Sequence, residues 1–213
     1  MSAFNIYNKL RGYGMTHAGT CAMMGNLMAE SSLIANIAQR GMTKLTDAEY
    51  TAKFDEYPET CYRDGVGYGL AQWTYWSRKQ NLFEFANARG KSVGDENTQI
   101  DFAVHELRTE YSGLYSYLCS TDDMYEATAR ICKEYERPAV NNIDRRYQFA
   151  QTFDRDFAGE VVARNPAASF PPDQSILVLQ AVLVANGYAT EITGYKSVDF
   201  FEKLREFVHD IGG

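Results

Sequence analysis

Residues 25–39, GNLMAESSLIANIAQ, and residues 64–82, DGVGYGLAQWTYWSRKQNL, decide most of what the sequence indicates about fold and function. The first stretch continues a run of small and apolar residues, beginning at Thr16, that recur at helical spacing. We expect a helix over about 16–34, with Thr16 as its N-cap and close packing on several sides. Glu30 would then lie near the C-terminus of a buried helix, where the helix dipole disfavours a carboxylate. A glutamate in that position is unfavourable for stability, which points to a functional role.

The second stretch breaks the helical pattern. Gly65, Gly67 and Gly69 predict a tight turn or a short hairpin in which the backbone comes close to another group. The three aromatic residues that follow are interpreted as core residues rather than as a platform for sugar stacking: Trp73, Tyr75 and Trp76.

Helical patterns cover most of the remaining N-terminal part. Thr46 and Glu49 form a capping box that predicts a short helix ahead of Tyr50. Further helices are expected over about 73–89, 97–111, 124–134 and 143–158. The sequence therefore predicts a mainly α domain over residues 1–160, with a short β-hairpin or loop wall near residues 40–70.

The composition changes after this domain. Residues 159–173 hold three of the five prolines, and we predict a linker over 161–173. Residues 174–213 are helical in pattern and form a small predicted module.

Charge and hydropathy exclude several classes of function. The formal net charge of −7 argues against a nucleic-acid partner. No apolar run reaches about 18 residues, so no membrane insertion is expected. The first residues lack the apolar core of a signal peptide, so we expect synthesis in a cytosol.

The four cysteines are expected to be reduced and mostly buried. They form no C-x-x-C pair, and with only three histidines in the chain neither a metal site nor a cofactor is expected. A Cys21–Cys61 or a Cys119–Cys132 disulfide remains open. His17 and Cys21 lie four residues apart on one helix face, and we interpret them as a buried structural pair rather than as a nucleophile and its base.

Glu30 has the setting that a glycosidase acid requires. Cleavage of a glycosidic bond needs a proton donor in a poorly solvated cleft, because burial raises the pKa of a glutamate and keeps it protonated near neutral pH. A glycine-rich turn opposite the acid can bring backbone groups close to a sugar without steric conflict.

These two stretches, together with YERPAVNNIDRRYQFAQTFDRDF at 135–157, resemble the phage tail-type lysozyme and endolysin glycosidase domains. Those domains are similar to goose-type lysozymes and soluble lytic transglycosylases, which share an E-S … G-L-x-Q pattern. Here the pattern is Glu30-Ser31 followed by Gly69-Leu70-Ala71-Gln72, and the resemblance covers residues 10–158.

The resemblance implies a lysozyme-like fold and a role for each matching residue. Glu30 would be the general acid that protonates the β-1,4 bridging oxygen between N-acetylmuramic acid and N-acetylglucosamine in the glycan strands of peptidoglycan. Gln39 could orient a hydrolytic water, although Ala35 and Ile37 depart from the family's pattern nearby. The expected substrate-binding residues are Ser31, Asn36, Tyr68, Gly69, Gln72 and Trp73.

A second catalytic carboxylate is less well defined. An inverting glycosidase needs one roughly 6.5–9.5 Å from the acid, and a retaining enzyme one at about 5–5.5 Å. Asp64, just before the glycine turn, is the preferred candidate, with Glu59 and Asp55 as the others. Arg145 and Arg146 are interpreted as a solvated face or as partners for nearby acids.

The expected protein is a monomeric peptidoglycan muramidase, either a phage endolysin or a virion-associated lysin, made in the host cytoplasm and acting on the bacterial wall. The C-terminal module loosely resembles small peptidoglycan-binding modules through residues 179–183, LQAVL, and 186–188, NGY. Two alternatives remain open: a lytic transglycosylase that forms 1,6-anhydro products, and a non-catalytic wall-binding or tail structural protein.

Overall fold

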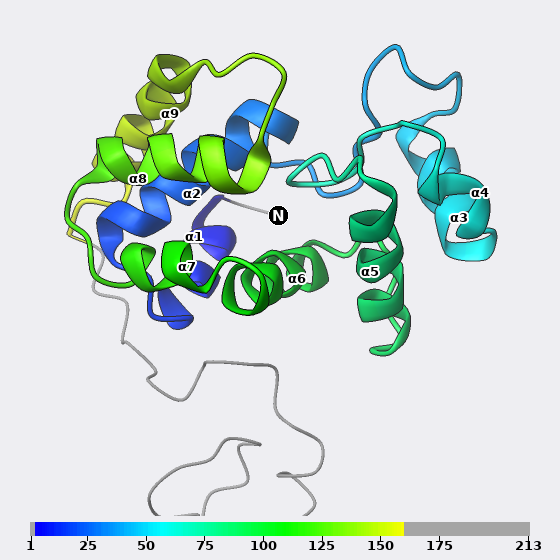
Figure 1. Ribbon diagram of the computed structural model, residues 1–213, viewed down its shortest axis with the longest axis horizontal. Coiled ribbons are helices and arrows are strands. Elements are labelled where there is room, and N and C mark those ends of the chain that lie inside the picture. The colour runs from blue at the N-terminus through cyan, green and yellow to red at the C-terminus, as the bar shows by residue number, and fades with distance from the viewer. Residues whose placement is uncertain (1–2, 160–213) are drawn as a thin grey trace, which may run out of the picture. The chain divides into compact units, whose positions relative to one another are not determined.

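The computed structural model describes residues 3–159, so the predicted linker and C-terminal module lie outside the described residues. Figure 1 shows a helical arrangement in this part of the chain. Its elements are α1 (Ala3–Gly12), α2 (His17–Ser31), α3 (Asp47–Glu56), α4 (Glu59–Tyr62), α5 (Trp76–Asn87), α6 (Glu96–Thr109), α7 (Ser112–Leu118), α8 (Met124–Arg130), the π-helical η1 (Ile131–Glu136) and α9 (Ile143–Asp156).

The predicted mainly α fold is confirmed. Between α2 and α5, the described backbone pairs only at isolated bridges, Ala38 with Tyr68 and Tyr68 with Trp73. The predicted hairpin is therefore a loop wall. Gly65 and Gly69 have φ angles of 73° and 77°, and Gln72 has a φ of 46°, so the chain turns repeatedly instead of extending as strands.

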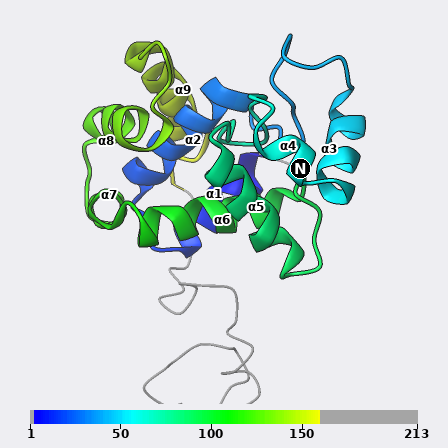
Figure 2. The ribbon, with the colours of Figure 1, turned by 45° about the vertical axis from the view of Figure 1, so that its right-hand side comes forward.

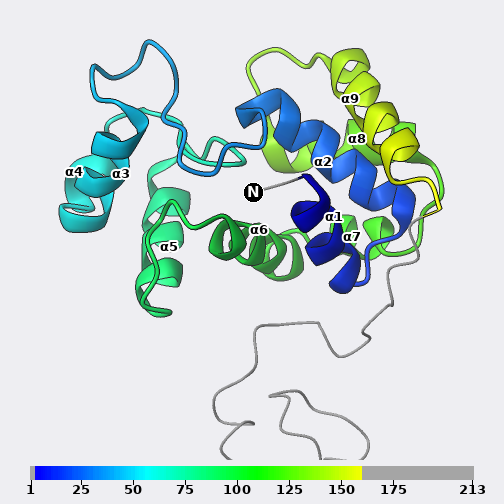
Figure 3. The ribbon, with the colours of Figure 1, turned by 180° about the vertical axis from the view of Figure 1, so that it is seen from behind.

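Helix α2 lies against α8 and α9 on one side and meets α7 near its N-terminus (Figures 1 and 3). Thr16 is the N-cap, as predicted, and its side chain accepts a hydrogen bond from the Gly19 backbone N–H at 2.9 Å. Most of the helix is buried. The helix ends at Ser31, three residues before the predicted end, because Ser32 adopts a left-handed conformation.

Two glycines of α2 permit this packing. A Cβ atom added at Gly25 would lie 2.6 Å from the Arg146 carbonyl oxygen and 2.8 Å from the Ala150 backbone nitrogen, both on α9. At Gly19, an added Cβ would lie 2.2 Å from the Leu118 carbonyl oxygen at the end of α7. The backbones of neighbouring helices therefore approach α2 more closely than any larger residue would allow.

Helices α3, α4 and α5 form the other end of the described part, where α4 contacts both α3 and α5 (Figure 2). The predicted capping box at Thr46 and Glu49 is present and starts α3. Tyr50 and Phe54 project from α3 into an aromatic cluster with Tyr68. This cluster joins α3 to the glycine-bearing loop.

The predicted helix over 124–134 extends further than expected and changes type. It runs as α8 to Arg130 and continues as the π-helix η1 to Glu136, after which Arg137 has a φ of 50° and Pro138 follows. Single turns of π-helix occur often at functional sites.

All four cysteines are free thiols, and neither disulfide left open by the sequence is formed. Across residues 3–159, none of the helices combines the length and the apolar character needed to traverse a lipid bilayer.

We predict that Gly25→Ala lowers the free energy of unfolding by about 2 kcal/mol, because the new methyl group overlaps backbone atoms of α9 that cannot rotate away. Urea unfolding followed by circular dichroism measures the change. Gly113→Ala in α7 is the control, since an added Cβ there meets nothing within 4 Å. Equal stability of the two variants would contradict the proposed close packing.

Candidate active site

A cleft of about 1050 Å³ runs between the end of α2 and the glycine-bearing loop. Its wall is formed by the end of α2, the loop after it, the loop leading into α5, the α6–α7 junction and the end of η1. The lining residues are Glu30, Ile37, Ala38, Gln39, Arg40, Met42, Gly65, Ala71, Gln72, Thr74, Tyr75, Ser77, Arg78, Glu110, Tyr111, Tyr135, Glu136, Arg137, Pro138 and Ala139.

Glu30 lies in the last turn of α2 and faces this cleft, with 18% of its side chain exposed. The next two turn residues, Ser32 and Leu33, have φ angles of 54° and 60°. Consecutive left-handed conformations are uncommon for residues other than glycine, and such backbone strain gathers at functional sites. The turn directs the chain away from Glu30 and leaves its carboxylate on the cleft wall.

Arg146 of α9 is the partner of Glu30. Its Nη2 donates a hydrogen bond to Glu30 Oε1 at 2.5 Å, and its Nη1 donates one to Asn26 Oδ1 at 3.2 Å. The guanidinium is nearly buried and offsets the unfavourable dipole at the end of α2. The interpretation of Arg146 as a partner for a nearby acid is therefore confirmed.

Gln39 and Gln72 line the cleft opposite Glu30, as the sequence predicted for cleft residues. Gln72 Nε2 donates to the Gly69 carbonyl at 3.0 Å, and Gln39 Oε1 accepts from the Gly67 backbone N–H at 3.1 Å. A Cβ at Gly67 would lie 3.1–3.2 Å from both amide oxygens. The glycine thus lets two polar side chains meet on this wall.

Three of the predicted substrate-binding side chains are buried instead of facing the cleft. Ser31 Oγ donates to the Leu27 carbonyl at 3.0 Å, which satisfies it within α2. The Tyr68 hydroxyl bonds Thr51 Oγ1 at 2.6 Å, and Trp73 Nε1 donates to Glu106 Oε2 at 2.8 Å. Both rings are fully buried, so their contacts shape the wall from behind.

Two further predicted positions also lie away from Glu30. An added Cβ at Gly69 would lie 2.5 Å from the Gln99 side chain, so this glycine serves close packing below the loop. Asn36 is exposed and lines a separate depression of about 510 Å³ that also includes Ser32 and Glu96.

Asp64 is not among the residues that line the described cleft. Its Oδ1 accepts from Lys79 Nζ at 2.7 Å and from the Val66 backbone N–H at 2.9 Å, and its Oδ2 accepts from the Tyr50 hydroxyl at 2.7 Å. These contacts are those of a structural ion pair, because Lys79 is completely buried and also bonds Tyr50 and Val66.

The two other candidate carboxylates, Asp55 and Glu59, are not among the residues that line the described cleft either. Asp55 accepts hydrogen bonds from Ser92 Oγ and the Val93 backbone N–H, and so fixes the chain before α6. Glu59 is exposed on α4. The structure brings none of the three predicted second carboxylates to the cleft beside Glu30.

The interpretation of all three aromatic residues near 73–76 as core residues is wrong for Tyr75 and for Trp76. Trp73 is buried, as predicted, but Tyr75 is 64% exposed and lines the cleft, and Trp76 is 37% exposed. Trp73 ends the loop wall by pairing with Tyr68, whereas Tyr75 is the N-cap residue of α5, and the two side chains therefore have different environments.

Glu136, at the end of η1, is a cleft carboxyl that the sequence did not single out. Its Oε1 is buried and has no hydrogen-bond partner among the described residues. Burial raises the pKa of Glu136 well above the ordinary glutamate value, and the charge of Glu30 raises it further, against the opposing effects of Arg78 and Arg146. Glu136 lies two residues before Pro138 in the segment 135–157, but the sequence of this segment alone assigns no role to Glu136.

Arg78 reaches the cleft from α5 and is held by a second buried carboxylate, Glu106. The Nε and Nη2 atoms of Arg78 donate to Glu106 at 2.7 and 2.8 Å. The Tyr135 hydroxyl donates to Glu106 Oε2 at 2.8 Å, as does Trp73 Nε1. Glu106 therefore ties the loop, α5 and η1 together behind the cleft.

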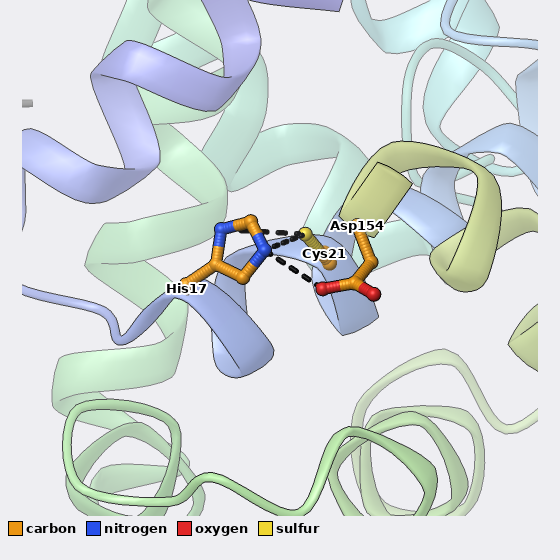
Figure 4. Close-up of side chains that lie close together, drawn as sticks. All are labelled: His17, Cys21 and Asp154. Carbon is orange, nitrogen blue, oxygen red and sulfur yellow. Dashed lines mark hydrogen bonds and ion pairs between the residues drawn. The ribbon is translucent and has the colours of Figure 1, made fainter. Parts of the chain in front are cut away.

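His17, Cys21 and Asp154 form a separate cluster between α2 and α9 (Figure 4), whose ligand atoms lie within 4.8 Å of one another. His17 Nε2 and Asp154 Oδ1 are 2.8 Å apart, and His17 Nδ1 bonds the Tyr7 hydroxyl at 2.7 Å. Burial and the nearby Asp154 raise the pKa of the Cys21 thiol to about 12. A thiol that stays protonated is a poor nucleophile. Cys21 is buried, as predicted for the structural pair, but the side chain of His17 is 35% exposed.

The helical fold and its acid-bearing cleft define a lysozyme-like enzyme. A family model described as phage tail lysozyme matches residues 2–157, and the chain belongs to this family. Membership makes peptidoglycan its substrate class and peptidoglycan degradation its activity.

We predict that Glu136→Gln changes how stability depends on pH. A carboxyl whose folded-state pKa lies above its unfolded value binds more protons when folded, so stability falls as pH rises above about 4.5. Thermal unfolding from pH 4.5 to 8 should therefore show a smaller decline for the variant than for the wild type. Parallel curves would contradict a protonated Glu136.

We also predict that Lys79→Met lowers the free energy of unfolding by about 3 kcal/mol, because it leaves Asp64 and Tyr50 without a buried partner. Arg40→Met, which breaks an exposed pair with Asp47, should cost less than about 1 kcal/mol. Urea unfolding compares them, and a similar small loss in both would show that the Lys79 pair is not structural.

Proposed function

We propose that this protein is a muramidase that cleaves the β-1,4 bond between N-acetylmuramic acid and N-acetylglucosamine, with Glu30 as the general acid. The observation that carries the proposal is the position of the Glu30 carboxyl, largely shielded from solvent at the end of a rigid helix and facing a cleft with polar groups on its opposite wall. A shielded acid across from hydrogen-bonding groups is the arrangement that glycosidic bond cleavage needs.

In this mechanism the carboxyl of Glu30 transfers its proton to the bridging oxygen as the bond from that oxygen to C1 breaks. A water molecule then adds to C1, and the proton it releases returns to Glu30. Each turnover therefore consumes one water and leaves the acid as it began. Gln39 lies on the opposite wall, where its amide can orient that water.

The same wall supports binding of the glycan. Gln72 offers amide groups, and Tyr75 offers an exposed ring whose face can pack against a sugar. Arg40 and Arg137 line the cleft as well and can contact the carboxylates of muramic acid and of peptide stems. Such contacts would explain how an acidic protein binds an anionic wall.

We further propose that the protein is a phage lysin, virion-associated or an endolysin, that acts on the bacterial wall. Membership of a phage tail lysozyme family supports this assignment. The lytic transglycosylase alternative uses the same acid but replaces water with the 6-hydroxyl of the muramic acid, so only the products separate the two reactions.

We predict that Glu30→Gln lowers the rate of release of soluble fragments from purified peptidoglycan by at least about 100-fold, because an amide cannot supply the proton. Glu59→Gln is the matched control, since Glu59 is exposed on α4 and outside the cleft. Circular dichroism establishes that both variants are folded.

Mass spectrometry of the fragments completes this experiment. Reducing N-acetylmuramic acid ends are expected for a muramidase, whereas 1,6-anhydro ends would identify a transglycosylase. Cleavage by folded Glu30→Gln at the wild-type rate would exclude Glu30 as the acid, and a wild-type protein that releases nothing would support the non-catalytic alternative.

A further inference from the structure

Besides Glu110, which follows α6, two carboxyl groups line the same cleft: Glu30 at the end of α2 and Glu136 at the end of η1. They lie close enough for the charge of Glu30 to act on Glu136. The mechanism proposed above uses only Glu30.

Arg146 creates a difficulty for that mechanism. Its guanidinium donates a hydrogen bond to Glu30 Oε1 at 2.5 Å, and a guanidinium stabilises negative charge on the group that it contacts. A general acid needs its proton near neutral pH. Some other group in the cleft must therefore offset the effect of Arg146.

The charges around Glu136 indicate which group this is. Four charged side chains act on it from four different helices: Glu30 from α2, Arg78 from α5, Glu106 from α6 and Arg146 from α9. Arg78 is paired with Glu106 and Arg146 with Glu30, so these four charges already sum to zero. An ionised Glu136 would add a further negative charge that these two ion pairs do not balance, next to an oxygen that is itself buried, and this is unfavourable.

The hydrogen bonds lead to the same conclusion. Among the residues described, neither Glu136 Oε1 nor Arg146 Nε has a protein hydrogen-bond partner, although both atoms are buried. A buried polar atom without a partner is costly, and such atoms gather where a ligand, a water or a proton transfer completes the site. The π-helical turn and the left-handed Arg137 hold Glu136 at this position on the cleft wall.

We propose that Glu30 and Glu136 share one proton, and that Glu136 is the positioning residue that keeps this proton available to Glu30 at neutral pH. Two carboxyls in one poorly solvated site cannot both ionise without strong repulsion, so the pair retains a proton to a higher pH than a lone carboxyl would. This inference rests on the proposed function, because it concerns the supply of the proton that Glu30 delivers.

The test is the dependence of peptidoglycan cleavage on pH for the full-length wild type and Glu136→Gln. Without Glu136, Arg146 is expected to favour the ionised form of Glu30 unopposed. The alkaline limb of the variant's activity profile should therefore move to lower pH by at least about one unit, which is about tenfold in rate on that limb.

Two further variants separate this role from a structural one. Glu134→Gln makes the same chemical change two residues away, in a half-buried pair with Arg130 outside the cleft, and should leave the profile unchanged. Glu136→Asp keeps a titratable carboxyl and should restore part of the alkaline limb. A uniform loss of activity at every pH, with no shift of the limb, would identify Glu136 as a structural residue and overturn the proposal.

Failure of this inference is distinguishable from failure of the proposed function. If the wild type cleaves walls, Glu30→Gln does not, and the profile of folded Glu136→Gln matches that of the wild type, the shared proton is excluded while the function of Glu30 stands. If Glu30→Gln cleaves walls at the wild-type rate, the proposed function itself fails.

Discussion

The close approach of α2 and α9 is the constraint on which the rest of the site depends. Gly25 removes the side chain that would separate the two backbones, and α9 can then place Arg146 against the last turn of α2. The same arginine offsets the unfavourable dipole at the end of that helix and holds the Glu30 carboxylate at the cleft wall. One contact therefore sets both the packing of α2 on α9 and the position of Glu30 on the cleft wall.

Buried charged residues behind the cleft also hold its walls together. Glu106 receives hydrogen bonds from Arg78, Trp73 and Tyr135, and so connects the loop wall, α5 and η1 through one buried carboxylate. Because Arg78 and Arg146 each already have an anionic partner, neither arginine is left as a separate counter-charge for Glu136. In the proposal made above, the cleft retains a proton because of how its ion pairs are distributed.

The sequence predicted the helical class, the helix bearing Glu30 and the presence of Gln39 and Gln72 on the cleft wall. These features follow from local patterns: helical spacing, a capping residue and a glycine-rich break. The sequence did not predict the Asp64–Lys79 ion pair. The loop between these two residues folds back through several turns, and the spacing of residues along the chain does not specify the geometry of those turns.

The sequence also did not predict which side chains of the loop face the core and which face the cleft. Tyr68 and Trp73 fall within the motif but face the core, whereas Tyr75, the N-cap residue of α5, follows the motif and faces the cleft. The role of Glu136 depends on a π-helical turn and on charges from four helices that are distant in sequence. A local sequence pattern cannot predict a site that depends on residues so far apart in the chain.

The measurement that addresses the shared proton most directly is the titration of glutamate side-chain carboxyl carbons by nuclear magnetic resonance. Glu30→Gln and Glu136→Gln would assign the two signals. At pH 7 the account predicts that the pair still holds one proton, with a titration step well above that of an exposed glutamate. Two fully ionised carboxyls at pH 7, both titrating in the ordinary range, would contradict it.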